Sequence, residues 1–176
     1  MKTIIVIICL LLNFHLLSAQ ESSKSLAEKF SERSGILVSK EFIELGIMDE
    51  IDIRYVKMSD LLTGEGLYAL RFEYQPNNEI VATPKIAYID SDEMELLKKA
   101  IKKLQSSVLT QHYSSQADFT FRCRSGLVFG YFYDFRNKKW VSYIQIDVND
   151  NKSTIQVEND GFAYLYNLIE NAQKIK

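Results

Sequence analysis

The chain has 176 residues, a formal net charge of −2 at pH 7, seven glycines and two prolines. Because basic residues are not in excess, nucleic acid and anionic membrane surfaces are not expected partners. The low glycine and proline content argues against a disordered chain, and the length fits one domain or two small halves that share a core.

Residues 1–19 have the pattern of a cleavable secretory signal peptide. Lys2 supplies the positive start, residues 3–17 are mainly apolar, and the small residues Ser18 and Ala19 follow. This order is typical of export signals, and the apolar run is shorter than the roughly 20 residues that a membrane-spanning helix needs. We therefore expect residues 1–19 to be removed, leaving a secreted or periplasmic protein without stable membrane anchoring.

Residues 20–35 predict an N-terminal arm or short helix, and a series of strands follows. Branched, aromatic and alternating residues indicate strands at 36–47, 51–58, 67–74 and 82–89. Apolar residues then recur at helical spacing at Met94, Leu97, Ile101 and Leu104. They predict a helix from Ser91 to about Ser106, with Asp90 and Glu93 as a capping box at its start.

The second half of the chain shows the same order of elements. Strands are predicted at 118–124, 127–135, 140–148 and 153–157, and a helix at 160–174. Turn residues separate these strands at Ser125-Gly126, at 136–139 and at 149–151. The apolar residues that the helix should bury are Phe162, Leu165, Ile169 and Ala172.

These elements predict an α+β fold in which antiparallel meanders carry two main helices packed on one side. Residues 36–176 are expected to form one domain with a tandem pseudo-repeat of strands then helix at 36–107 and 108–176, although shared helix-start residues are an alternative explanation of the similarity. A constant offset aligns the two helices and places Leu97 on Leu165. Upstream, Phe72 matches Phe132 at a different offset, which indicates an insertion or a different strand count. The layout resembles TATA-binding-protein-like and β-lactamase-inhibitor-protein-like repeat folds, a resemblance that implies no function.

Few residues suggest catalysis or metal binding. Cys123 is the single cysteine outside the first 19 residues, and alternation with Phe119 and Phe121 predicts that it is buried, although a reactive thiol or an intermolecular bridge is the alternative. His112 is predicted to be a surface linker residue without metal-ligand partners. The acidic cluster that begins at Asp90 is interpreted as helix capping, so no metal and no cofactor is expected.

Aromatic and arginine residues supply the candidate binding surface. Phe129, Tyr131, Tyr133 and Phe135 share one face of their strand by alternation, and Trp140 and Tyr143 follow on the next strand. Tyrosine and arginine are favoured at binding surfaces, although cross-strand packing of the aromatics is the alternative interpretation. The candidate ligand- or partner-binding residues are Tyr131, Tyr133, Arg122, Arg124 and Trp140.

The sequence therefore favours a non-catalytic, exported binding or interaction module in the bacterial periplasm or the extracellular space. Its partner would be a protein, a peptide or a glycan. The alternative is a small secreted, hydrolase-like enzyme whose site converges only in the fold. A deep pocket with several perturbed ionisable groups would favour the enzyme, whereas a shallow aromatic face would favour the binding module.

Overall fold

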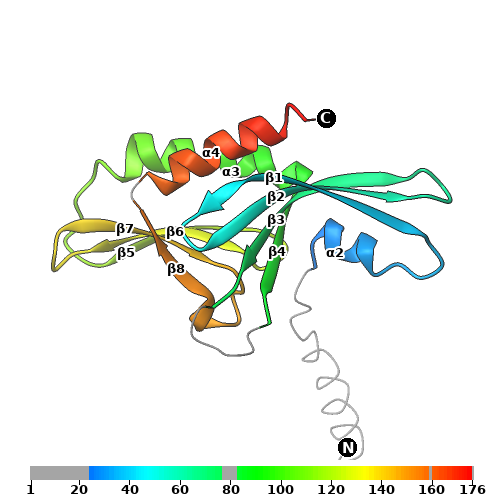
Figure 1. Cartoon of the computed structure of the whole chain (residues 1–176). Helices are drawn as coiled ribbons and strands as arrows, with labels where there is room; N and C mark the ends of the chain where they lie inside the picture. Colours follow the sequence, from blue (N-terminus) through cyan, green and yellow to red (C-terminus); the bar gives the residue numbers. More distant parts are fainter. Residues whose placement is uncertain (1–23, 77–82, 159, 176) are drawn as a thin grey trace, which may run out of the picture.

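A computed structural model describes residues 24–76, 83–158 and 160–175 and confirms the α+β class. The signal peptide predicted at residues 1–19 lies outside the described residues. Two antiparallel four-stranded sheets follow a short helix, and each sheet is followed by a longer helix (Figure 1). The elements in chain order are α2 (Leu26–Ser31), β1 (Val38–Met48), β2 (Ile51–Asp60), β3 (Gly66–Tyr74), β4 (Lys85–Asp90), α3 (Ser91–Lys103), a π-helical turn (Leu104–Val108), β5 (Ala117–Arg122), β6 (Val128–Asp134), β7 (Lys139–Gln145), a 3₁₀ turn (Asn151–Ser153), β8 (Thr154–Val157) and α4 (Gly161–Ala172).

Each sheet is a meander in which neighbouring strands follow one another in the chain. Sheet A has the order β1-β2-β3-β4 and sheet B the order β5-β6-β7-β8. The turns fall where the sequence predicts them. Between β6 and β7, the Asp134 carboxylate accepts backbone N–H groups from Arg136 and Asn137. Asp134 therefore fixes the turn that sets the β6–β7 register.

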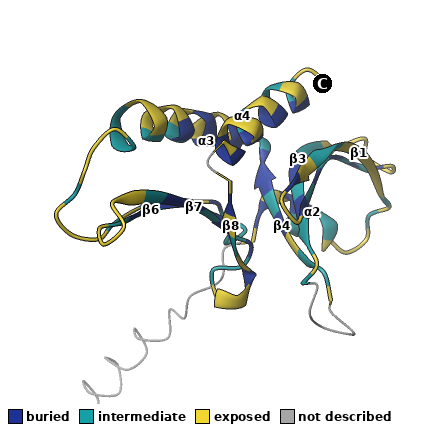
Figure 2. Cartoon of the chain, turned by 60° about the vertical axis from the view of Figure 1, so that its left-hand side comes forward, coloured by how far each residue is buried: buried dark blue, intermediate teal, exposed yellow. Residues whose placement is uncertain are grey.

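Helices α3 and α4 lie together above the strands in both views (Figures 1 and 2). They contact each other, α3 also contacts β3 and β4, and α4 contacts β1. The apolar stripe predicted for each helix is buried: Met94, Leu97 and Ile101 on α3, and Phe162, Leu165, Ile169 and Ala172 on α4. Beneath them the two sheets share one core, in which the rings of Phe72 and Phe129 meet edge to face, 5.7 Å apart.

Helix α2 packs on the other face of sheet A. Ala27 and Phe30 form a second, smaller core with Val56, Met58 and Ala69. Because helices cover sheet A on both sides, Tyr55 and Val56 are buried although they are neighbours on β2. The N-terminus of α2 is held by Ser25, whose side chain accepts from the Glu28 N–H at 3.1 Å.

The two halves agree in strand number, which corrects part of the sequence alignment between them. Leu97 and Leu165, which the alignment pairs, are both buried on the core side of the two long helices. Phe72, however, lies on β3, the third strand of its half, and Phe132 lies on β6, the second strand of the other. In the described residues each half has four strands, so the match of Phe72 with Phe132 does not reflect equivalent positions and the different offset does not come from a different strand count.

Within residues 24–76, 83–158 and 160–175, no helix combines the length and the apolar character needed to span a membrane.

Candidate functional site

Arg124 belongs to an ion cluster at the junction of the two halves. Its guanidinium lies 3.3 Å from the Asp90 carboxylate and 3.8 Å from that of Glu93, and it also pairs with Asp92. Its backbone N–H donates to Glu93 at 2.8 Å. Asp90 in turn accepts the N–H groups of Leu26, at 2.7 Å, and Ala27, at 3.1 Å. The cluster therefore joins α2, α3 and the turn between β5 and β6, which gives Arg124 a structural role.

The same contacts bear out the capping interpretation of the acidic cluster. Glu93 accepts the Asp90 N–H at 3.1 Å, and together they form the capping box of α3. Burial raises the pKa of Glu93, an effect that the Arg124 N–H, the Asp90 N–H and the Arg124 charge oppose. Among the described residues, no group of three or more His, Cys, Asp or Glu side chains could hold a metal ion.

The two tyrosines predicted to bind a partner lie in the core. Tyr131 is 3% exposed and packs edge to face on Phe162 at 4.8 Å, and Tyr133 is 2% exposed. Neither side chain can contact a ligand in this conformation, so the cross-strand packing interpretation fits both residues. Cys123 is buried on this side of the molecule, as predicted, and burial raises the pKa of its thiol.

Trp140 is half-buried in an aromatic cluster at the end of sheet B. Its ring lies 5.1 Å from Tyr133, 5.6 Å from Tyr113 and 5.7 Å from Phe119, and its indole N–H donates to the Gln111 carbonyl at 3.3 Å. These contacts anchor the segment that leads from α3 into β5. Trp140 therefore has a packing role as well as a partly exposed edge.

Arg122 is the candidate that remains on an exposed surface, the outer face of sheet B. We use this name for the side of β5–β8 turned away from α3 and α4. In an antiparallel ladder, partner residues point to the same side of the sheet, so alternate residues of all four strands lie on the outer face. These are Asp118, Thr120 and Arg122 of β5, Val128, Gly130 and Phe132 of β6, Val141, Tyr143 and Gln145 of β7, and Thr154 and Gln156 of β8.

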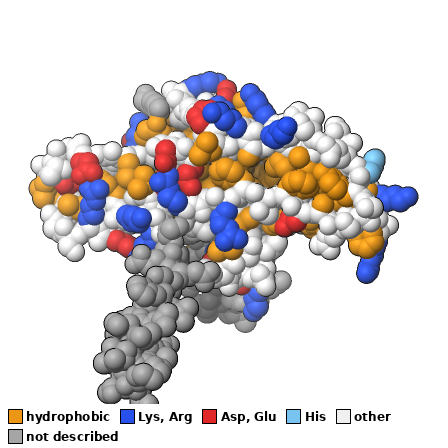
Figure 3. Space-filling model, turned by 180° about the vertical axis from the view of Figure 1, so that it is seen from behind, with side chains coloured by type: hydrophobic (Ala, Val, Ile, Leu, Met, Phe, Trp, Pro, Cys, Tyr) orange, Lys and Arg blue, Asp and Glu red, His pale blue; other side chains and the backbone are white. Residues whose placement is uncertain are grey.

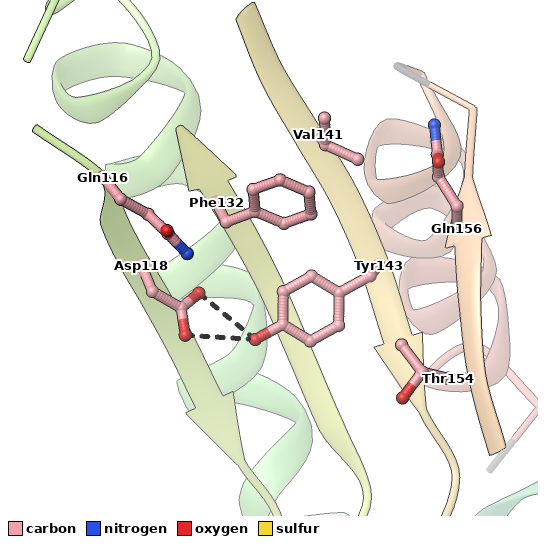
Figure 4. A pocket seen from close by; sticks show the side chains of 7 residues that line it. All are labelled: Gln116, Asp118, Phe132, Val141, Tyr143, Thr154 and Gln156. Atoms are coloured by element: carbon pink, nitrogen blue, oxygen red, sulfur yellow. Dashed lines mark hydrogen bonds between the residues drawn. The ribbon is translucent and has the colours of Figure 1, made fainter. Parts of the chain in front are cut away.

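Tyr143 lies at the centre of the outer face. Its cross-strand partner is Gly130, and its ring occupies the space that a β-carbon on Gly130 would need. The phenol oxygen lies 3.2 Å and 3.4 Å from the two carboxylate oxygens of Asp118 on β5 (Figure 4). Burial and the neighbouring Asp118 charge raise the pKa of Tyr143 to about 12. The phenol therefore keeps its proton at neutral pH and donates a hydrogen bond to Asp118.

Around this pair the outer face forms an open hollow of about 370 Å³. Phe132 and Val141 add apolar surface beside Tyr143, and the remaining lining residues are polar (Figure 4). The polar residues are Gln116, Asp118, Thr154 and Gln156. A hollow with an aromatic floor and a few polar groups at its rim has the composition of small-ligand sites.

Burial separates the aromatic residues of β6 into a core-facing row and an outer-facing residue. Alternation correctly grouped Phe129, Tyr131 and Tyr133, but this row faces the core, and Phe132 faces the ligand-sized hollow. The sequence also suggested Trp140 and Tyr143 as parts of one aromatic set, but their side chains lie on opposite faces of β7. The sequence did contain a signal for the outer face. Arg122 alternates with Phe119 and Phe121 and therefore lies on the opposite side of β5, and the same alternation places Asp118 on that side.

On the back of the molecule, neither positive nor negative side chains are concentrated in one place among the described residues (Figure 3). Lys and Arg side chains are interspersed with Asp and Glu side chains there, and hydrophobic side chains form a band across the middle (Figure 3). We take the outer face of sheet B as the candidate site because its hollow brings Tyr143 together with apolar and polar side chains. Comparison with models of known protein families, with curated proteins and with solved structures finds no match to this chain.

Proposed function

We propose that this protein is an exported, non-catalytic binding module that contacts a protein, peptide or glycan through the outer face of sheet B. The observation that carries the proposal is the open hollow centred on Tyr143, which an aromatic ring, apolar side chains and polar groups line together. Export rests on the charge and hydropathy pattern of residues 1–19. The proposed location is the periplasm or the extracellular space.

The protonation of Tyr143 suits a hydrogen-bonding role in binding. A catalytic acid or base works best when its pKa lies near the operating pH. Tyr143 has its pKa raised to about 12, away from neutrality, so it serves as a fixed hydrogen-bond donor. The face thus offers orientation and contact area to a partner.

Site-specific photo-crosslinking in cells tests the binding surface. A photo-reactive amino acid replaces Thr154, which is exposed in the hollow, and in a control chain it replaces Leu62, which is exposed on the turn after β2. We expect an adduct in the envelope or medium fraction from position 154 and none from position 62. Equal labelling at both positions, or none at either, would show that the outer face has no specific partner.

N-terminal sequencing of the same material tests export. The chain recovered from the periplasm or the medium should begin near Gln20. A membrane-bound product that begins at Met1 would overturn the proposed location.

A further inference from the structure

The outer face of sheet B presents a flat aromatic ring to solvent. Tyr143 lies over Gly130, where the phenol oxygen and Cε1 would each be 2.6 Å from a β-carbon at that position. The glycine thus lets the ring lie down on the backbone of β6. Figure 4, which looks onto the sheet, shows the ring broadside with its hydroxyl directed at Asp118. One side of the ring rests on β6, and the half-buried ring keeps part of its surface exposed in the hollow.

The groups around the ring form both kinds of hydrogen bond. Gln116 and Gln156 each offer an amide donor and an amide acceptor, and Thr154 offers a hydroxyl that does both. Asp118 accepts from Tyr143, and its carboxylate has capacity for further donors. Such a set matches a ligand with many hydroxyl groups, each of which donates and accepts.

From these observations we propose that the outer face of sheet B binds a neutral oligosaccharide, stacked by one sugar ring on Tyr143 and hydrogen-bonded to Asp118, Gln116, Gln156 and Thr154. The proposal rests on the proposed function and names the ligand class of that site. The apolar face of a pyranose ring would cover the aromatic surface while its equatorial hydroxyls reach the rim. From β5 to β8 the face crosses three strand spacings, about 14 Å, so it spans more than a single sugar.

A peptide fits this face less well. Extended peptides bind sheets chiefly by main-chain hydrogen bonds at an exposed edge, whereas the hollow lies on the face, where the backbone groups of β6 and β7 pair with neighbouring strands. The lining residues include one carboxylate and no basic side chain, so no charge pattern selects an acidic ligand. Neutral hydroxyl-rich ligands suit both features.

Binding is measured by isothermal titration calorimetry on the protein purified after expression of the full chain, with the neutral probes maltohexaose, cellohexaose, mannohexaose and the hexamer of N-acetylglucosamine. At least one probe should bind. Tyr143→Ala should weaken that binding by roughly tenfold or more, as expected for a central aromatic contact. Gly130→Val should weaken binding similarly, because the valine side chain would push the Tyr143 ring off β6 while leaving every lining side chain in place. Tyr164→Ala, at an exposed tyrosine on α4, is the control and should leave it unchanged.

Gln156→Ala gives an independent test, because it removes an exposed side chain on β8 and leaves the ring untouched. It should weaken binding severalfold with an unchanged unfolding midpoint. No binding to any probe at millimolar concentration would overturn the oligosaccharide, and so would binding that survives both Tyr143→Ala and Gln156→Ala. If position 154 then still crosslinked a protein in cells, the binding module would stand with a different ligand. If crosslinking failed as well, both proposals would fall.

Discussion

The ion cluster between the halves tests how this fold is held together. Arg124→Ala removes the guanidinium that pairs with Asp90, Asp92 and Glu93. The Asp90 and Glu93 side chains are 2% and 10% exposed, so both carboxylates would stay buried without their cation. Removing one partner of a buried ion pair costs about 3–5 kcal/mol. Because 31% of the Arg124 side chain is exposed and water can enter in its place, we expect the lower end, about 3 kcal/mol.

The loss of stability should depend on pH. Burial raises the folded-state pKa of Glu93 above its unfolded-state pKa. The stability that protonated Glu93 contributes is therefore fully present below the unfolded-state pKa, and it is lost as the pH rises through the folded-state pKa. Arg124 opposes this shift, so its removal raises the folded-state pKa of Glu93 further. The loss of unfolding free energy caused by Arg124→Ala should therefore be larger at about pH 7 than at about pH 4, which is near the ordinary pKa of glutamate.

Urea unfolding followed by far-ultraviolet circular dichroism measures the change in unfolding free energy. An unchanged m-value would show that the variant and the parent can be compared as two-state systems. Arg122→Ala is the matched control, because this arginine lies two residues earlier and is exposed. It should change the unfolding free energy by less than about 0.5 kcal/mol. Similar losses for the two variants, or a loss below about 1 kcal/mol for Arg124→Ala, would refute the role given to the cluster.

Three further predictions test the core. Leu97→Ala should cost roughly 2–5 kcal/mol in urea unfolding, whereas Leu96→Ala, at a 55% exposed neighbour on the same helix, should cost under about 1 kcal/mol; equal costs would mean that the helix faces are misassigned. Cys123, which is 3% exposed, should resist a thiol reagent in the native protein and react quickly in urea, and rapid native labelling would contradict its burial. The buried Tyr131 hydroxyl has no hydrogen-bond partner among the described residues. Tyr131→Phe should therefore leave stability unchanged or raise it by up to about 1 kcal/mol, and a loss of that size would mean that the hydroxyl is paired.

Local pattern was enough to predict most of the architecture. The spacing of Leu97 with Ile101, and of Leu165 with Ile169, fixed the buried face of each long helix because a helix leaves one stripe toward the core. Strand ends were less well predicted. The strand predicted at 140–148 ends at Gln145, because Asp147 already caps the following turn by accepting the Asn149 N–H.

The candidate site could not be predicted in the same way, because both faces of β6 carry aromatic residues. Alternation separates Tyr131 from Phe132 but does not say which of them meets the core. That choice depends on contacts distant in the sequence: Tyr131 packs on Phe162 of α4, and Phe129 packs on Phe72 of sheet A. A pattern confined to one strand contains neither contact.

A difference between the two halves explains why the outer face of sheet B is uncovered in the described part of the chain. In the first half, α2 precedes β1 and packs on the outer side of sheet A, where Phe30 covers Val56 and Met58. In the second half, the segment before β5 turns to the inner side instead, where Tyr113 packs on Phe119 and Trp140. The described part of the chain therefore supplies no counterpart of α2 for the outer face of sheet B, and the repeat leaves the Tyr143 hollow open to a ligand.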